Sequence, residues 1–254
     1  MGIVAIFNQK GGVGKTTTAV NLGAALARRG RIPYGIDLDP QAQYSSISGV
    51  HAASGDDTVL SLFQRNRPLR ELLVQSKSGH HIIPAHLELS KVDTLFGKGY
   101  NIVNRLNTGL RSERFAEEGR PVLIDCSPLI GVLTLNAIFA CQGLLVPISA
   151  DHLSAMAALQ VDKTLKALEQ VLKHRVPRRF LLTRFDARRR MGSEVQRMLE
   201  DRFGSDVCRT RISENVSLAE SPAHNMTVYE HAPNSRGAQD YDTLLDELIE
   251  AGFF

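Results

Sequence analysis

A short apolar segment that runs directly into a glycine-rich loop constrains this chain more than any other feature. Ile3–Phe7 contains β-branched residues and predicts a buried strand, and residues 8–14 (Asn-Gln-Lys-Gly-Gly-Val-Gly) follow it. A helical pattern opens at about Lys15 and ends near Gly30. Strand, glycine loop and helix in this order form an anion cradle, because backbone N–H groups and the helix N-terminus approach phosphate oxygens.

The side chains of this loop indicate a nucleotide bound with Mg²⁺. Lys15 would reach the β- and γ-phosphates, Thr16 would ligate Mg²⁺, and Thr17 would hold the α-phosphate. The ordinary G-x-x-x-x-G-K-[ST] pattern requires glycine at position 9, where this chain has Gln9. Lys10 instead adds a second cation, and one nucleotide site seldom needs both lysines.

Further apolar runs predict the sheet to which this loop belongs. The expected strands are Tyr34–Leu38, Val122–Ile124, Leu144–Ile148 and Phe180–Thr183, with Val207–Ile212 and His81–Ile83 as weaker candidates. Continuous apolarity is typical of parallel strands buried on both faces, and helical patterns lie between several of them. The chain is therefore expected to be α/β, with a doubly wound, mostly parallel twisted sheet flanked by helices in three Rossmann-like layers. We find no internal repeat and no long linker, so we expect one domain over residues 1–254.

Three acids follow apolar strands, at the edge where open α/β sheets place their ligands. Asp37 and Asp39 come at the end of the second strand, and Asp125 comes directly after Val122–Ile124. We expect Asp125 to hold Mg²⁺ directly or through a water, and Asp37 to support that metal shell. The alternative is that these carboxylates only cap the turns that follow the strands.

Three motifs in this order resemble those of the ParA/MinD family of P-loop ATPases. K-G-G-V-G-K-T-T at 10–17 is similar to the deviant Walker A motif, I-D-L-D-P-Q at 36–41 to the second motif, and V-L-I-D-C-S-P at 122–128 to the Walker B motif. The resemblance implies ATP and Mg²⁺ as cofactors and a nucleotide-sandwich homodimer in which Lys10 contacts the other subunit's nucleotide. It also implies that Asp39 orients the attacking water, so that the catalytic set is Lys10, Lys15 and Asp39.

The resemblance continues through residues 181–190 and 212–222 and favours the ParA branch. In that branch the second segment lies beside the adenine, which makes Ser213 and Asn215 candidate base contacts. Relatives usually carry a proline and two arginines where this chain has Ser213, Glu214 and Ser217. The residues expected to bind the nucleotide are Lys10, Gly11, Gly12, Val13, Gly14, Lys15, Thr16, Thr17, Ser213 and Asn215.

A basic run in the C-terminal half predicts non-specific DNA binding. The candidate contacts are Arg175, Arg178, Arg179, Arg184, Arg188, Arg189 and Arg190. Several phosphate contacts would give sequence-independent, salt-sensitive binding to the nucleoid. Ser217 replaces an arginine that belongs to the DNA surface of the relatives, and a charged run is also compatible with a solvated face.

Other classes of site and compartment are disfavoured. The net charge of +3 permits a polyanionic partner without requiring one. The cysteines at 126, 141 and 208 lack metal or redox spacing, and the histidines at 80, 81 and 86 lack ligand spacing, so the cofactors expected are ATP and Mg²⁺ alone. The final helical pattern is acidic and would pack on the sheet, unlike the basic membrane helix of the MinD branch. A cytoplasmic, nucleoid-associated chain is expected.

The first hypothesis is therefore an ATP-driven switch that positions chromosome or plasmid DNA, with hydrolysis stimulated by a ParB-like or adaptor protein. Alternatives are a ParA-like protein that positions a microcompartment or chemosensory array, a MinD-like membrane regulator, and a small-molecule P-loop kinase. Lys10 argues against the kinase, which has no second nucleotide to contact. Because the chain begins at its first strand, we expect no N-terminal helix-turn-helix, and residues 49–107 are the hardest part to interpret.

Overall fold

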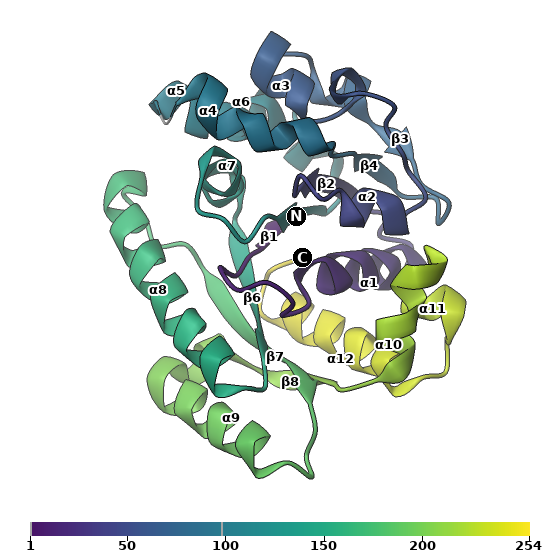
Figure 1. The fold of residues 1–254 in the computed structure, drawn as a ribbon, viewed down its shortest axis with the longest axis vertical. Helices are drawn as coiled ribbons and strands as arrows, with labels where there is room; N and C mark the ends of the chain where they lie inside the picture. Colours follow the sequence, from purple (N-terminus) through teal and green to yellow (C-terminus); the bar gives the residue numbers. More distant parts are fainter. Residues whose placement is uncertain (1, 98) are drawn as a thin grey trace.

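The computed structural model describes residues 2–97 and 99–254, and its strands form one eight-stranded sheet (Figure 1). The strand order is β3-β4-β2-β5-β1-β6-β7-β8, and every neighbouring pair is parallel except β3 with β4. The strands are β1 Ile3–Ile6, β2 Tyr34–Leu38, β3 Val74–Gln75, β4 His81–Ile83, β5 Val122–Cys126, β6 Gly143–Ser149, β7 Arg178–Phe185 and β8 Val207–Ser213. The expected doubly wound α/β fold is confirmed.

Helices connect most of the strands. The α-helices are α1 Lys15–Arg28, α2 Gln43–Ile47, α3 Leu60–Arg65, α4 Val92–Phe96, α5 Tyr100–Val103, α6 Arg105–Ser112, α7 Val132–Ala140, α8 His152–Leu172, α9 Arg190–Phe203, α10 Val216–Glu220, α11 Val228–His231 and α12 Arg236–Glu250. Short 3₁₀ helices are η1 Gly55–Asp57, η2 Leu69–Leu72, η3 Leu87–Lys91, η4 Phe115–Glu118, η5 Gly204–Asp206 and η6 Ser221–His224. Among the described residues, no helix is both long and apolar enough to cross a membrane.

The two faces of the sheet bury separate hydrophobic cores. Alternate residues of the central strand point to opposite faces, so that Ala5 belongs to one core and Val4 and Ile6 to the other. Helices α3, α6, α7, α8 and α9 cover the first face, and α1, α2, α10, α11 and α12 cover the second (Figure 1). The sheet is buried on both sides, which explains why its strands are continuously apolar in sequence.

The centre of the sheet positions the glycine loop. β1 lies between β5 and β6, and Ile6 is in register with Asp125 on one side and Leu145 on the other. The loop that follows β1 therefore leaves the carboxyl edge of the sheet beside Asp125. This edge is the usual ligand site of an open α/β sheet.

All seven strands expected from sequence are present, with ends that differ by at most a few residues. The strand β3 was not expected, because Val74–Gln75 is short, exposed and carries no apolar run. In the part of the chain from α3 to α6, helices α4, α5 and α6 contact α7, α3 contacts α6, and buried residues of α3 and α6 belong to the core of the first face. As expected, α12 packs on the sheet, with Tyr241, Leu244, Leu245 and Leu248 buried.

Candidate nucleotide site

The glycine loop joins β1 to α1 in the backbone geometry of an anion cradle. Gly12 and Gly14 have φ angles of 73° and 88°, which a residue with a Cβ rarely adopts. Gly14 is the N-cap of α1 and offers no side chain to the free N–H groups at the helix start. Those groups are left for a bound anion, which the helix dipole also favours.

Lys15 lies inside this loop as a buried cation. Only 7% of the residue is exposed, and its ammonium donates a 3.2 Å hydrogen bond to the carbonyl oxygen of Lys10. Burial lowers the pKa of Lys15, and the carboxylates of Asp125 and Asp39 act in the opposite direction. An ammonium held here by one carbonyl has donors left for phosphate oxygens.

Asp125 has one engaged oxygen and one orphaned oxygen. Thr16 Oγ1 donates to Asp125 Oδ2 at 2.7 Å, while Oδ1 is buried without a hydrogen-bond partner in the described part of the chain. Burial, and then the neighbouring Asp37, raise the pKa of Asp125 well above its ordinary value. A hydroxyl beside an unsatisfied buried carboxylate oxygen is a donor set that suits Mg²⁺, so these residues fit the expected metal.

Asp37 is fully buried next to Asp125, its register partner across β2 and β5. Its Oδ1 accepts the backbone N–H of Asp39 at 3.1 Å, and its Oδ2 accepts the N–H and hydroxyl of Ser45 at 2.9 and 2.7 Å. Burial raises the pKa of Asp37 to about 6 despite these hydrogen bonds. Because both oxygens are engaged, Asp37 fixes the segment that carries Asp39 in place beside the Asp125 carboxylate.

Asp39 faces the cavity at the mouth of the loop. This cavity has a volume of about 620 Å³ and is lined by Gly11, Lys15 and Thr16 as well as Asp39. Asp39 Oδ1 accepts the N–H of Gln41 at 3.0 Å, which orients the carboxylate. The cavity thus brings the predicted phosphate, metal and water-orienting residues together.

Lys10 points away from this cavity, toward its own α8. Its ammonium donates to Asp151 Oδ1 at 2.8 Å and to Ser154 Oγ at 2.7 Å. Asp151 is also the N-cap of α8 and accepts the N–H of Ser154 at 2.9 Å. The two lysines of the loop therefore occupy different environments: Lys15 is enclosed by the phosphate loop, whereas Lys10 lies on its rim.

Known proteins similar to this chain include ATPases, in agreement with the geometry of the site. A family model described as an AAA domain matches residues 1–177. The chromosome-partitioning ATPase Soj of Thermus thermophilus is 40% identical over 253 residues, which cover 97% of this chain and 94% of that protein. The sporulation initiation inhibitor protein Soj of Bacillus subtilis is 31% identical over 98% of this chain and 99% of that protein. This chain belongs to the ParA/MinD family of P-loop ATPases.

Solved structures of similar length share the fold. Cobyrinic acid a,c-diamide synthase from Mycobacterium smegmatis, with bound ADP and magnesium, has a TM-score of 0.84 and 26% identity and covers 98% of this chain and 94% of its own. The cell division ATPase MinD of Pyrococcus furiosus has a TM-score of 0.79 at 20% identity, covering 99% of this chain and 100% of its own. At 20% identity, the likeness to MinD concerns the fold alone.

A second cavity adjoins the phosphate loop, because Gly14 and Thr17 line it as well. It has a volume of about 340 Å³ and includes Ser213 and Asn215, the two residues predicted to lie beside the base. Asn215 also caps α10 by accepting the N–H of Leu218 at 3.3 Å. The sequence did not identify Pro222 and Tyr241, which line the same cavity, because helical periodicity assigns Tyr241 to the core.

A side chain of β7 holds the phosphate loop in place, and the sequence analysis did not predict this contact. Thr183 Oγ1, near the end of β7, donates to the carbonyl oxygen of Val13 at 2.9 Å. The preceding apolar run predicted the strand, and its carboxyl end is the signal that could have placed Thr183 at the site.

The predicted DNA-binding arginines do not form one surface. Arg175, Arg178 and Arg179 lie before or at the start of β7, and Arg188, Arg189 and Arg190 lie beyond its end. Eight strand residues at about 3.3 Å each separate the two groups by about 25 Å. Arg189 also pairs with Glu214 at 3.1 Å, so an acid lies within the second group.

The prediction for Arg178 is corrected. Its side chain is buried and pairs with Asp162 at 3.1 Å and with Glu169, both on α8. A buried guanidinium between two carboxylates compensates their negative charge and is not available to a DNA phosphate. The sequence could not show this, because the two acids lie 16 and 9 residues away.

Proposed function

We propose that this chain is a ParA-type ATPase that dimerises on ATP and partitions or positions chromosome or plasmid DNA. The position of Lys10 carries the proposal, because its ammonium lies on the rim of a phosphate loop that already contains Lys15. Similarity to Soj over 97% of the chain supports the same conclusion. A homodimer, the nucleoid and a protein that stimulates hydrolysis are the proposed partners.

The proposed cofactors are ATP and Mg²⁺. The backbone of residues 11–14 and the ammonium of Lys15 would bind the phosphates, while Thr16 and Asp125 would hold the metal. When bound, Mg²⁺ supplies positive charge to the phosphate oxygens. Ser213 and Asn215 would contact the base from the adjacent cavity.

The carboxylates of Asp39 and Asp37 have different proposed roles. Asp39 lines the phosphate cavity and would orient the attacking water, which is the catalytic role proposed for it. Asp37 is a positioning residue, because it acts through the backbone N–H of Asp39 and through Ser45. Its replacement is expected to impair hydrolysis without direct contact with the nucleotide.

Apolar side chains around the same mouth support dimerisation. Leu87 and Leu129 line the phosphate cavity and are 62% and 74% exposed. Leu153, next to the Lys10 contacts on α8, is 71% exposed. Exposed leucines on a nucleotide-binding rim suit burial against a second copy of the chain.

The residues proposed to contact DNA are now fewer than those of the basic run. Arg188, Arg189 and Arg190 are exposed at the start of α9 and form the principal group, while Arg175 and Arg179 lie at the far end of β7. Binding through such contacts should weaken steeply as salt is added.

A protein cargo is the second candidate function. The ion pair of Arg189 with Glu214 and the serines at 213 and 217 reduce positive charge near the proposed DNA contacts. A ParA-like chain that positions a protein assembly through an adaptor would share the ATP-driven dimer. Co-purification from the native cell separates the two candidates, since a ParB-like protein with DNA supports the first and an adaptor with an assembly supports the second.

The dimer is tested with Asp39→Ala. In excess Mg-ATP this variant should bind ATP without hydrolysing it and accumulate as a dimer in light scattering. The double variant Lys10→Ala with Asp39→Ala should remain monomeric under the same conditions. A monomeric Asp39→Ala chain that still binds ATP would contradict the sandwich model.

The DNA contacts are tested with Arg188→Glu combined with Arg189→Glu. This variant should lose ATP-dependent retention on DNA, because two phosphate contacts become repulsive. The matched control is Arg197→Glu combined with Arg202→Glu, which changes the same charge on exposed arginines farther along α9. Equal retention by the two double variants would show that the principal group is misassigned.

A further inference from the structure

Arg184 stands between the two cavities of the nucleotide site. It lines both the 340 Å³ base cavity and the 620 Å³ phosphate cavity, and it shares this position only with Gly14 and Thr17 among the lining residues. The preceding residue, Thr183, is fastened to the phosphate loop by its 2.9 Å hydrogen bond to Val13. The backbone that carries Arg184 is therefore held in fixed register with the loop.

The backbone at Arg184 is strained in a way that aims this side chain. Its φ angle is 51°, and the pairing of β7 with β8 is irregular between Leu182 and Phe185. The other non-glycine residues with positive φ in the described chain cap helices: Ala42, Asn66, Arg114, Lys173 and Asn225. Arg184 alone lies inside a strand, where an irregularity of this kind redirects a side chain toward a site.

The guanidinium of Arg184 is also free. It is exposed and forms no ion pair with any acid in residues 2–97 and 99–254, whereas Arg188, Arg189 and Arg190 each pair with a carboxylate. A planar guanidinium with five donors suits phosphate oxygens. Strain that retains an unpaired arginine beside a phosphate cavity is better explained by a ligand than by folding.

We propose that Arg184 binds the nucleotide of its own subunit, donating to the phosphate chain where it joins the ribose. This inference rests on the proposed nucleotide site and extends it to a residue first predicted to contact DNA. Arg184 thus raises the affinity for nucleotides that carry phosphates over that for the bare nucleoside. The base cavity contacts the adenine.

The test uses Arg184→Gly, which removes the guanidinium and relieves the strained backbone. The matched control is Lys173→Gly, which removes a positive charge from another exposed residue with positive φ (61°), at the C-cap of α8. Both variants should melt at or slightly above the wild-type temperature, because glycine adopts positive φ without cost. Loss of folding therefore does not obscure the comparison.

Calorimetric titration with Mg-ADP and with adenosine measures the contact. Arg184→Gly should bind Mg-ADP about ten-fold more weakly than wild type, because a charge-assisted hydrogen bond is lost. Its affinity for adenosine and both affinities of Lys173→Gly should stay within about two-fold of wild type. Arg184→Lys should fall between, because it keeps the charge and loses the fork.

Three results would overturn the inference: unchanged affinity of Arg184→Gly for Mg-ADP, an equal loss for adenosine, or loss of DNA retention with normal affinity for Mg-ADP. The last result would return Arg184 to the DNA surface. A wild-type chain that fails to bind Mg-ADP would instead overturn the proposed function, so the two failures are distinguishable.

Discussion

Lys10 and Asp151 form an ion pair within one chain, with 2.8 Å between Nζ and Oδ1. Ser154 Oγ accepts a second hydrogen bond from the same ammonium at 2.7 Å. In the proposed dimer Lys10 reaches the partner's nucleotide, so the contact within the chain and the contact between chains compete for one side chain. On this proposal, Asp151 opposes dimerisation, because it holds Lys10 within its own chain.

Asp151→Asn should promote the ATP-dependent dimer. Asparagine preserves the N-cap of α8 but removes the charge that holds Lys10. A half-exposed ion pair is worth up to about 1 kcal/mol, so the protein concentration needed for dimerisation should fall by up to about five-fold for each pair released. Sedimentation in Mg-ATP measures this change. The control is Asp206→Asn, which breaks the exposed ion pair with Arg175. If Asp151→Asn dimerised no more tightly than wild type, the prediction would be contradicted.

The sequence predicted that the glycine loop and the three acids lie together, because the determinants of this arrangement are local. The glycine loop is contiguous, and Asp37, Asp39 and Asp125 each follow an apolar run that predicts a buried strand. Parallel strands bring such ends to one edge, so the convergence of the acids follows from the fold class. The orphaned oxygen of Asp125 is a packing outcome and has no counterpart in the sequence.

The basic run misled the sequence prediction at Arg178, because tertiary pairing rather than residue type decides which of its arginines are exposed. Arg178 and Arg184 belong to one basic run, yet Arg178 is buried against α8 and Arg184 borders the nucleotide cavities. The acids that enclose Arg178 come from an earlier helix, and the positive φ of Arg184 cannot be read from residue type. Tertiary pairing decided both positions.

Arg178→Met should destabilise the fold and leave the DNA contacts intact. Methionine retains much of the side-chain volume but leaves Asp162 and Glu169 without their buried partner. We expect the free energy of unfolding in urea to fall by about 3 kcal/mol, the lower end for a broken buried pair, because Lys166 still contacts Asp162 at 2.9 Å.

Two variants delimit this effect. Arg175→Met removes an exposed arginine and should cost less than about 1 kcal/mol. Adding Asp162→Asn and Glu169→Gln to Arg178→Met should recover part of the stability, because no buried charge is then unpaired. A stable Arg178→Met chain that has lost DNA retention would restore the original DNA assignment.

His80 should make the fold sensitive to acid. The residue is 1% exposed and stacks on Tyr44, and burial lowers its pKa to about 4 from an ordinary value of 6.5. The unfolded chain therefore takes up a proton below about pH 6.5 that the folded chain refuses until about pH 4, so stability falls across this window as pH falls. At about 1.4 kcal/mol per pH unit, His80 contributes about 3 kcal/mol to that fall.

His80→Gln isolates this contribution. Urea unfolding at several pH values should give a shallower loss of stability between pH 6.5 and 4 than in wild type, although the variant starts lower at pH 7 because the Ser76 and Ser78 contacts change. His51→Gln, which removes an exposed histidine, serves as the control. Identical pH slopes for wild type and His80→Gln would refute the assignment.

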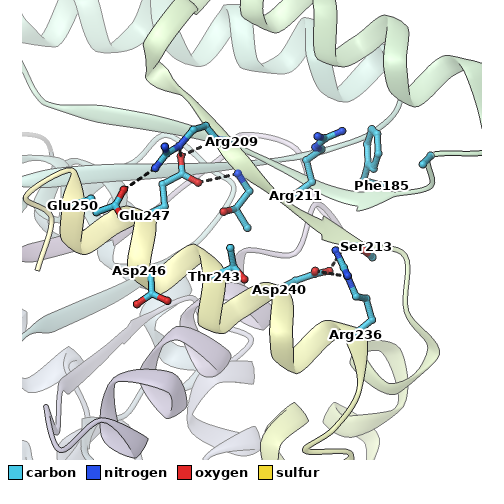
Figure 2. Close-up of a pocket in the computed structure, with 12 residues that line it drawn as sticks. Phe185, Arg209, Arg211, Ser213, Arg236, Asp240, Thr243, Asp246, Glu247 and Glu250 are labelled. Atoms are coloured by element: carbon cyan, nitrogen blue, oxygen red, sulfur yellow. Dashed lines mark hydrogen bonds and ion pairs between the residues drawn. The ribbon is translucent and has the colours of Figure 1, made fainter.

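Glu247 protects the open edge of the sheet. β8 is one of the two edge strands of the sheet, and Glu247 on α12 accepts the backbone N–H groups of Arg209 and Thr210 at 2.7 and 2.8 Å (Figure 2). Asp240 accepts the N–H of Ser213 at 2.8 Å farther along the same strand. Carboxylates of one helix thus occupy donors that would otherwise be available to a strand of another chain.

Glu247→Ala should therefore promote association through β8. We expect light scattering to rise with protein concentration in the absence of nucleotide, and the melting temperature to fall by a few degrees for about 1–2 kcal/mol of lost hydrogen bonding. Glu250→Ala is the matched control, because Glu250 lies three residues farther along the same helix and, within the described chain, its carboxylate pairs only with the Arg209 side chain, at 2.7 Å. Equal scattering from the two variants would mean that the side-chain charges on α12, rather than the capped backbone of β8, keep the chains apart.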